Sequence, residues 1–506
     1  MGSCLLNFNP SICFVRRCLH KNLSASVDVF LKLLALIVES ETIITLSLPN
    51  PSHEGRGYVK TAGQLNDEML SSMRAPTWRW HVLAFGLGAV VAWGLAAFTY
   101  QVMTGMNVTG KNRPVMWGFY ITSFVFWVGL SHSGTMVSAI LRLSEANWRR
   151  PILRAAEAMT VFSITVAGLF PIIHLGRNWV VHYFLPYPNQ RGLWPNFRSA
   201  LLWDVTAITT YLIGSTLFLY LGMLPDLAVA RDRSSGWRRK VYEVLAMGWR
   251  GSSREWSVYH KASTLMAALI IPVAVSVHSI VAWDFAVTVV PGWHSTIFPP
   301  YFVIGAITSG VAAVISLMII IRRAFHLEDY LTPLHFDNMG KLLLVICLLW
   351  SYAYFVDVNI IWYAHEPIEW EVFSFMADKY TLLLLLMLFG NSVLPIVTLC
   401  FKKLRRNITL MLVVSLLINV CMFIERYLII VPSLSRKNMP FVWHTYFPSW
   451  VEMSIAAAAF AGFALLYTIF AKYFPIMAVT DVRELEVRKA HVPLGRAKVP
   501  AIAGDD

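Results

Sequence analysis

The sequence predicts an all-α polytopic membrane protein with about ten transmembrane helices, and three observations support this prediction. Of the 506 residues, 57% are hydrophobic and only 14% are charged, and the mean hydropathy of +0.57 is too high for an ordinary soluble domain. The apolar residues form continuous runs, whereas the strands of a membrane barrel would alternate apolar and polar residues. Aromatic residues make up 13% of the chain and include 19 Trp, which suits belts at two membrane surfaces.

Ten apolar runs have the length that a helix needs to cross a bilayer. They cover residues 80–102, 116–141, 155–174, 200–223, 261–284, 298–321, 340–363, 380–401, 408–431 and 448–471. Most charged residues fall between these runs, in short loops.

Residues 1–58 do not fit this pattern. Their one apolar run, VDVFLKLLALIVES, is short for a membrane span, and no convincing small-residue cleavage site of a signal peptide follows it. We expect this segment to be a disordered extension or the product of a mis-annotated start, with Val59 as an alternative initiator.

The loops predict the orientation of the chain. Lys and Arg are concentrated in the loops at 142–154, 231–254, 322–323 and 402–406. The loop at 285–297 has no Lys or Arg, and the loop at 365–379 has only one Lys. Because basic loops stay in the cytoplasm, we expect the N-terminal segment 59–79 and the tail 472–506 to be cytoplasmic and the loop 175–199 to face outward. The net charge of +13 then reflects membrane orientation rather than a surface for nucleic acid.

The six cysteines argue against a covalent haem or an iron–sulfur cluster in this chain. Three lie within the first 20 residues, and the other three stand singly in or at the ends of apolar runs. No CxxCH motif and no clustered set of cysteines is present. If the protein handles electrons, such cofactors belong to partner subunits.

The second run carries a histidine near its middle. His132 is flanked by Ser131, Ser133 and Gly134, and polar groups at membrane depth face the interior of a helix bundle. Two interpretations stay open: a helix-packing notch with a hydrogen-bonded histidine, or a group that handles a proton or a ligand.

Four residues border the long loop after the third run. His174 and Arg177 end that run, and Trp203 and Asp204 open the fourth. All four lie at a similar depth near the outer surface if the loop folds back. Anchoring at the membrane surface is the alternative role for Arg177 and Trp203. Asp204 is the stronger candidate for chemistry, because a carboxylate just inside an apolar helix is costly to bury.

The fifth run ends with His278 and Asp284, which are six residues apart and therefore on different faces of a helix. Both lie in the outward third of the run, at the depth expected for His174 and Asp204. Oxidation of a quinol requires an acceptor at each hydroxyl and an exit for two protons, and a histidine–carboxylate pair supplies both near neutral pH. Convergence of these two pairs from neighbouring helices predicts a quinol-oxidising site.

The later runs carry a second set of ionisable residues: Lys341, Tyr354, Asp357, Glu425, Arg426 and Glu452. Asp357 and Arg426 lie at similar depth, so one interpretation is a buried ion pair between them. The other interpretation is a proton path through this half of the chain, since buried carboxylates relay protons in pumps.

Five segments carry a family resemblance. They read WGFYITSFVFWVGLSHSGTMVSAI, AAEAMTVFSITVAGLFPIIHLGRNW, LWPNFRSALLWDV, LGMLPDLAVARDR and SVHSIVAWDFAV. These segments resemble the NrfD/PsrC family of quinone-interacting membrane subunits, and more narrowly the ActC subunits of bacterial alternative complex III. The resemblance covers about residues 64–474. It implies two four-helix bundles, at 116–284 and 298–431, flanked by the helices at 80–102 and 448–471.

The resemblance also implies a function. Menaquinol or ubiquinol would be oxidised on the periplasmic side of the first bundle, with His132, Asp204, His278 and Asp284 at the site. Electrons would pass to a periplasmic iron–sulfur subunit and on to c-type cytochrome subunits, so this chain itself would bind no metal and no haem. A second NrfD-like membrane subunit, a place in the bacterial inner membrane and proton translocation through the bundles are further implications.

Two other functions stay open on the sequence. A haem-b membrane cytochrome would need two histidines that face each other, for which His174 and His278 are the candidates. A secondary transporter would use the central His132 and the acidic residues, but it predicts broken helices, and glycine or proline interruptions are sparse in the runs.

Overall fold

The computed structural model describes residues 62–73, 76–184, 200–437, 439–483, 491–494 and 497–500. Within this described part, ten helices are long and apolar enough to cross a membrane, so the all-α polytopic prediction is confirmed. They are α3 (Trp78–Thr104), α4 (Gly118–Leu143), α5 (Leu153–His174), α6 (Ala200–Asp232), α8 (Ser253–Ala286), α9 (Phe298–Ala324), α10 (Pro333–Ala364), α12 with η5 and α13 (Thr381–Leu399), α15 (Ile408–Ser435) and α16 (Trp450–Tyr473). All ten belong to one of the two units of the chain, the unit that comprises 59–143 and 147–506. Of the other unit, 1–58 with 144–146, only the last three residues are described, so the expectation for 1–58 lies outside the described residues.

Short elements connect the long helices. They are α2 (Ala62–Met69), η1 (Leu70–Met73), η2 (Met106–Val108), η3 (Asn147–Arg149), η4 (Asn178–Phe184), α7 (Gly236–Leu245), α11 (Pro367–Lys379), α14 (Lys402–Arg405) and η6 (Pro440–Val442). In the tail, β1 (His491–Leu494) pairs antiparallel with β2 (Ala497–Pro500), which adds one short hairpin to an otherwise helical chain.

Several helices are longer than the apolar runs that predicted them. α8 begins at Ser253, eight residues before the run, because Ser252 and Glu255 form a capping box in which each side chain bonds the other residue's backbone N–H. α6 likewise continues to Asp232, beyond the end of its run. Hydropathy marks the membrane segment, whereas the caps mark the helix ends.

Four helices close into a first group, in which α4, α5, α6 and α8 each pack against the next and α8 packs back on α4. α4 is buried almost all round, since it also packs against α9 and α15. Small residues permit this close packing. A Cβ on Gly134 would lie 2.1 Å from the Ala156 carbonyl oxygen of α5.

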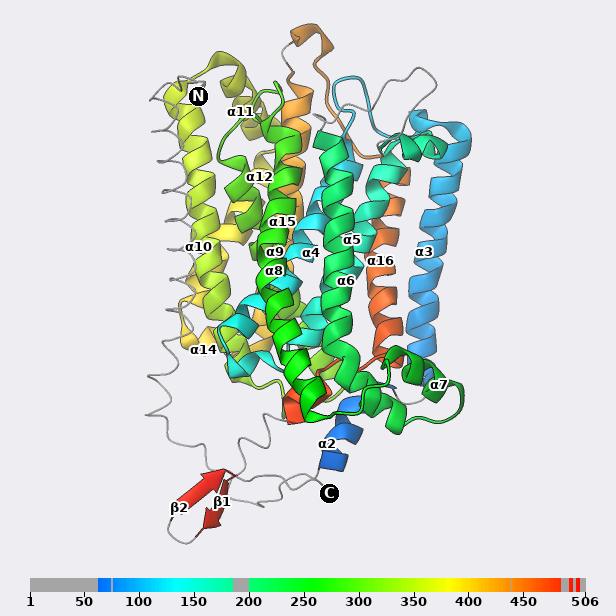
Figure 1. The fold of residues 1–506 in the computed structure, drawn as a ribbon. Helices are drawn as coiled ribbons and strands as arrows, with labels where there is room; N and C mark the ends of the chain where they lie inside the picture. The colour runs from blue at the N-terminus through cyan, green and yellow to red at the C-terminus, as the bar shows by residue number, and fades with distance from the viewer. Residues whose placement is uncertain are drawn as a thin grey trace, which may run out of the picture. The chain divides into compact units, whose positions relative to one another are not determined.

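The helices α9, α10, α12 to α13 and α15 close into a second group in the same way. η5 (Phe389–Val393) is a π-helical turn within it. The groups meet where α9 packs against α4 and α8. There Ser133 donates a hydrogen bond to the Ala306 carbonyl over 2.7 Å, and a Cβ on Gly310 would lie 2.0 Å from the Ser133 Cβ. Figure 1 shows the long helices side by side, with the α3 and α16 pair at one edge.

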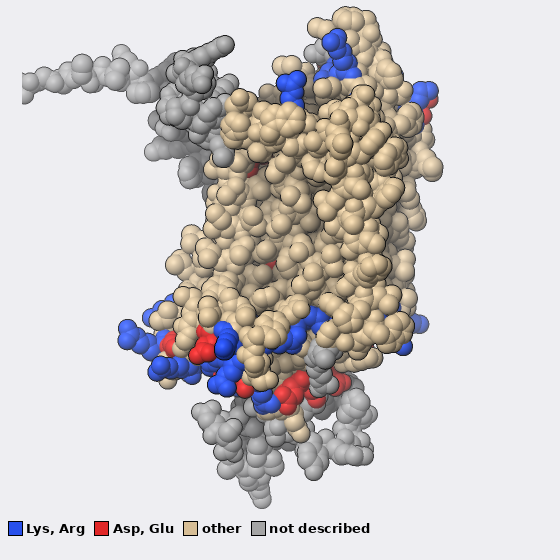
Figure 2. All heavy atoms as spheres, turned by 90° about the vertical axis from the view of Figure 1, so that its right-hand side faces the viewer, with Lys and Arg blue, Asp and Glu red and all other residues tan. Residues whose placement is uncertain are grey.

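On the face shown in Figure 2, charged side chains gather at the two ends of the helices, and the belt between the ends shows very few of them. Lys and Arg are most numerous at the lower end, where α7 and α14 lie, and we call this the basic end. The C-terminal ends of α5 and α8 and the N-terminal end of α6 lie at the opposite end (Figure 1).

Candidate functional site

The first layer of the candidate site is a pair of Trp–Asp dipeptides, one near the start of α6 and one near the end of α8. The carboxyl groups of Asp204 and Asp284 lie within reach of a hydrogen bond to each other, and both side chains are buried. The rings of Trp203 and Trp283 meet edge to face, with their centroids 6.0 Å apart. Because an ionised carboxylate only accepts hydrogen bonds, a bond between two carboxyl groups requires a proton on one of them. The pair can therefore hold one proton or two.

His132 of α4, Tyr211 of α6 and His278 of α8 form a second, deeper layer. The rings of His132 and Tyr211 stack with centroids 4.4 Å apart and planes 4° apart. The rings of His132 and His278 have centroids 4.9 Å apart. None of the three side chains is more than 1% exposed. Three neighbouring helices thus bring two histidines and a tyrosine together in the middle of the first group.

The hydrogen bonds of His132 assign its protons. Its Nδ1 lies 2.6 Å from the Val128 carbonyl oxygen, and a carbonyl oxygen only accepts, so Nδ1 carries the hydrogen. In the neutral ring the other nitrogen, Nε2, is then an acceptor. Nε2 is buried and has no hydrogen-bond partner among the described residues, and the ring nitrogens of His278 have no side-chain partner there.

The two layers lie one above the other along α6 and α8, and together we call them the polar seam. Asp204 and Tyr211 are seven residues apart on α6, and Asp284 and His278 are six apart on α8, which separates the layers by about 9–10.5 Å along the helix axes. In the first layer too, one oxygen of each carboxyl, Oδ1, is buried without a hydrogen-bond partner in the described part of the chain. Buried polar atoms normally have partners, so each exception requires an explanation.

His174 lies in a different neighbourhood. Lys111 Nζ is 2.8 Å from His174 Nδ1 and lies over the ring of Tyr120, 4.6 Å from its centroid. Burial lowers the pKa of Lys111 from 10.5 to about 7, although the charge of Glu452 acts in the opposite direction. Arg177 is exposed. The structure therefore brings together His132, Asp204, His278, Asp284 and Trp203, and it places His174 beside Lys111. The haem ligand pair His174 and His278 gains no support, since His278 lies against His132.

In the second group, Glu425 is the centre of a buried network. Tyr301 donates a hydrogen bond to its Oε1, and Trp350 Nε1 donates to the same oxygen over 3.0 Å. Arg426 Nη1 lies 3.3 Å from Glu425 Oε2, and the Arg426 guanidinium lies over the ring of Phe302, 4.7 Å from its centroid. Arg426 thus pairs with Glu425, and the alternative of an ion pair with Asp357 is wrong, because the neighbouring carboxylate on the same helix already holds the guanidinium.

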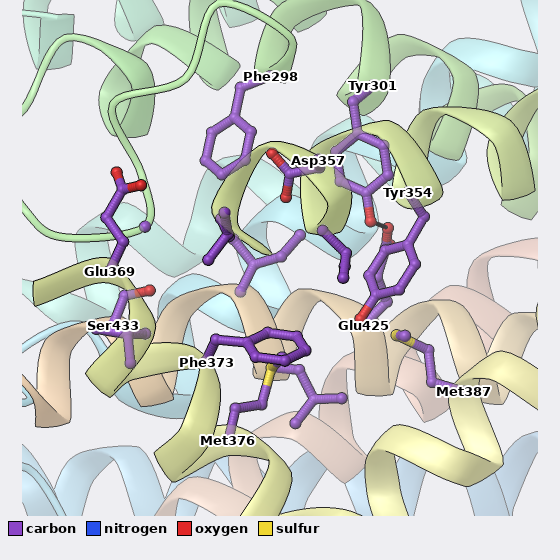
Figure 3. A pocket seen from close by; sticks show the side chains of 16 residues that line it. Phe298, Tyr301, Tyr354, Asp357, Glu369, Phe373, Met376, Met387, Glu425 and Ser433 are labelled. Carbon is purple, nitrogen blue, oxygen red and sulfur yellow. Dashed lines mark hydrogen bonds between the residues drawn. The ribbon is translucent and has the colours of Figure 1, made fainter. Parts of the chain in front are cut away.

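Asp357 instead lines a cavity of about 70 Å³ at the end of the second group opposite the basic end (Figure 3). Ser295 is its hydrogen-bond donor, at 3.5 Å. Tyr354 and Glu425 line the same cavity, with apolar walls that include Phe298 and Met387. This volume is large enough for water, since one water needs about 10–15 Å³ of such space.

The remaining two predicted residues lie apart from this cavity. Lys341, near the basic end, donates a hydrogen bond to Asn338 over 3.2 Å and lies 3.9 Å from Asp337. Glu452 is the third residue of α16 and accepts hydrogen bonds from Gly110 N at 2.8 Å and from the Tyr446 hydroxyl at 2.7 Å. It also completes the capping box of that helix. A part for either residue in a proton path stays a prediction.

Sequence reasoning missed several residues of this architecture. Tyr211 and Trp283 were not predicted, although the repeated Trp–Asp dipeptide and the seven-residue spacing from Asp204 to Tyr211 are visible in the sequence. Buried charges at the basic end were missed too: Arg154 binds Asp226 at 2.8 Å and lies 3.4 Å from Glu157. Arg154 falls in a predicted basic loop, so nothing in the sequence indicates that its charge is buried.

No group of three or more His, Cys, Asp or Glu side chains in the described part of the chain is arranged to hold a metal ion. The fold and the buried polar seam define a polytopic helical membrane subunit whose ionisable groups face one another inside the first helix group. Residues 107–436 match the family model described as "Polysulphide reductase, NrfD", and the chain belongs to this NrfD family. The family resemblance is thereby confirmed, while the narrower resemblance to ActC stays a prediction.

Curated relatives are similar over most of their length. A putative dimethyl sulfoxide reductase membrane subunit of Halobacterium salinarum is 26% identical over 421 residues, which are 77% of this chain and 90% of that protein. A selenate reductase subunit of Mesobacillus selenatarsenatis is 21% identical over 79% of this chain and 94% of its own. An Hdr-like menaquinol oxidoreductase integral membrane subunit of Archaeoglobus fulgidus is 22% identical over 70% of this chain and 80% of its own.

Proposed function

We propose that this chain is the quinol-oxidising membrane subunit of an electron-transfer complex, with the quinol headgroup bound between the two layers of the candidate site. The observation that carries this proposal is that the two layers hold three buried acceptor atoms without a hydrogen-bond partner among the described residues, Asp204 Oδ1, Asp284 Oδ1 and His132 Nε2. Two hydroxyls of a quinol would donate to acceptors on opposite sides of the ring. The separation of the layers, about 9–10.5 Å, is close to the length of such a ring with a hydrogen bond at each end.

Oxidation of one quinol to a quinone releases two protons and two electrons. In this proposal the neutral His132 Nε2 accepts one hydroxyl proton, and the Asp204–Asp284 pair accepts the other. Asp204 is the fifth residue of α6 and Asp284 is two residues from the end of α8, so the carboxyl pair lies near the aqueous surface. That position offers the protons a short exit.

The relatives support an electron-accepting partner. Two of them are named as subunits of reductases, and the third is named as part of a menaquinol oxidoreductase. We propose menaquinol or ubiquinol as the donor and a periplasmic iron–sulfur subunit as the first acceptor. c-Type cytochrome subunits and a second NrfD-like membrane subunit make up the rest of the complex, as the resemblance to ActC of alternative complex III implies.

The same proposal fixes the orientation in the bacterial inner membrane. The basic end seen in Figure 2 lies in the cytoplasm, as the positive-inside rule requires. Both termini are then cytoplasmic. The candidate site, at the opposite end, faces the periplasm and the proposed iron–sulfur partner.

The test is the substitution Asp204→Asn in the complex purified through a tag on this chain. We expect quinol oxidation to fall about 100-fold or more, the usual contribution of a positioned acid or base, while all subunits still co-purify. The matched control is Asp232→Asn, an exposed aspartate at the other end of the same helix, which should keep wild-type turnover. Unchanged turnover in the Asp204 variant would remove the carboxyl pair from the reaction.

One observation supports a second role, coupling to proton translocation. The cavity of the second group joins Asp357, Tyr354 and Glu425 near the periplasmic end of the proposed orientation (Figure 3). We propose that water in this cavity exchanges protons with Asp357, so that the second group carries a proton path while the first group oxidises quinol.

A further inference from the structure

A surface far from the candidate site has the character of a lipid-binding helix. α7 connects the ends of α6 and α8 at the basic end (Figure 1). One face of α7 is fixed to the helix ends: the Tyr242 hydroxyl donates to the Tyr473 carbonyl over 2.7 Å. Arg238 donates to the Met73 carbonyl over 2.9 Å and lies over the ring of Tyr473. These contacts hold α7 in one orientation, with its other face outward.

The outward face carries a row of large apolar side chains. Trp237 is 61% exposed, Val241 42%, Val244 77% and Met247, just beyond the helix, 75%. The spacing of Trp237, Val241 and Val244 by three or four residues places these three along one side of the helix. A soluble surface rarely exposes such a row without a partner.

Basic residues flank the row. Between residues 231 and 261 the chain has eight Lys and Arg and only three Asp and Glu. Arg239 and Lys240, which follow Trp237 and Arg238 in α7, are exposed. Trp249 and Trp256 pack edge to face nearby, with centroids 5.2 Å apart. Tryptophan, aliphatic side chains and a basic fringe together are typical of helices that lie in the interface of an anionic membrane leaflet.

We propose that the α7 surface, defined here as Trp237, Arg239, Lys240, Val241 and Val244, binds anionic phospholipid of the leaflet at the basic end. The apolar row enters the region where headgroups meet acyl chains, and Arg239 and Lys240 bind the phosphates. The position of α7 favours lipid over a protein partner. The apolar run of α6 ends at 223 and that of α8 begins at 261, and α7 lies in the chain between them, so it is reached beyond the hydrocarbon core, on the side of the headgroups.

The proposal is tested on the full-length chain by native mass spectrometry after delipidation and addition of an equimolar mixture of phosphatidylglycerol and phosphatidylcholine. The wild type should retain phosphatidylglycerol in preference. The double variant Arg239→Gln with Lys240→Gln should bind phosphatidylglycerol roughly 30-fold more weakly, since each basic residue near an anionic surface changes affinity roughly fivefold. Both side chains are exposed, so the variant should fold.

The matched control removes the same charge at the same end: Lys402→Gln with Lys403→Gln on α14, both exposed, should leave the lipid preference at the wild-type level. An equal loss in both variants would overturn the proposal, because net charge and not α7 would then set the preference. Unchanged lipid retention in the α7 variant, with or without loss of a co-purifying protein, would also overturn it. None of these outcomes depends on whether the chain oxidises quinol.

Discussion

Both four-helix groups place buried carboxyl groups toward the end opposite the basic end, but these carboxyl groups have different hydrogen-bond and ion-pair partners in the two groups. In the first group, Asp204 and Asp284 lie within reach of a hydrogen bond to each other, and one oxygen of each has no partner among the described residues. In the second group, Glu425 Oε1 accepts hydrogen bonds from Tyr301 and Trp350, and its other oxygen, which accepts no hydrogen bond there, lies 3.3 Å from the Arg426 guanidinium. A carboxylate that faces a cation is compensated inside the protein, whereas an open carboxyl oxygen with no cation beside it suits a ligand or water that donates a hydrogen bond.

At the basic end the two groups are more alike. Arg154 of the first group donates to Asp226 over 2.8 Å and to the Gly222 carbonyl over 2.6 Å. Arg405 of the second group donates to Asp337 over 2.7 Å and to the Leu399 carbonyl over 2.6 Å. Each arginine joins a buried carboxylate to a backbone carbonyl, which for Arg154 lies inside α6 and for Arg405 at the end of α13. The groups therefore differ where the proposed chemistry lies and share a stabilising device where it does not.

The largest expected effect is on quinol oxidation, and it should differ between a carboxylate of the first group and a carboxylate of the second group. Asp284→Asn should lower quinol oxidation about 100-fold or more, because the first-layer pair loses one of its two acids. Asp357→Asn should leave quinol turnover within about twofold, because its side chain lies in the cavity of the second group, but it should change the number of protons released per electron. Both quantities are measured on the reconstituted complex with a quinol and a pH indicator.

The control for this comparison is Asp378→Asn, an exposed aspartate of α11, which should change neither quantity. A normal proton stoichiometry in the Asp357 variant would assign that residue a structural role. A comparable loss of quinol oxidation in both variants would contradict the assignment of quinol oxidation to the first group and of a proton path to the second.

The next effect concerns stability. Arg154→Met leaves Glu157 and Asp226 buried without their shared cation, and removal of one partner of a buried ion pair costs about 3–5 kcal/mol. Arg405→Met should cost less, about 1.5–3 kcal/mol for the charged hydrogen bond to Asp337, because Lys341 and Arg406 still lie within 3.9 Å of Asp337. The measurement is the free energy of unfolding of the purified chain in a denaturant titration. Equal losses would contradict the expected difference in how the two carboxylates are compensated.

Hydropathy was sufficient to predict the ten helices, because burial of the backbone in lipid allows only helices or closed barrels and the runs do not alternate. It also located His132, Asp204, His278 and Asp284, since ionisable groups inside apolar runs are few. Their partners could not be predicted, because contacts between helices depend on how each helix is rotated. Asp284 faces α6 and His278 faces α4, although both stand on α8.

The errors have the same origin. Similar depth suggested an ion pair between Asp357 and Arg426, but depth does not determine which side of a helix a residue occupies. Arg426 lies beside Glu425 instead. The pairing of His174 with Lys111 was missed because Lys111 stands in a connecting loop, where lysine is ordinarily solvated.

The smallest expected effect is that of Lys111. It tests how burial of a lysine changes the dependence of the free energy of unfolding on pH. Burial lowers its pKa in the folded protein to about 7 from 10.5. Between these two pH values the folded chain has lost the Lys111 proton while the unfolded chain keeps it. The unfolded state then binds more protons, so the free energy of unfolding should rise as the pH increases from about 7 to about 10.5.

Lys111→Met removes this titration, so the rise of the melting temperature across that pH range should become smaller by a few degrees. Thermal melts of the purified chain between about pH 6.5 and 10 provide the measurement. Lys403→Met, at an exposed position on α14, is the control and should keep the wild-type pH dependence. If the Lys111 variant also keeps it, Lys111 is solvated in the folded protein, and the contact with His174 then contributes no titration of its own.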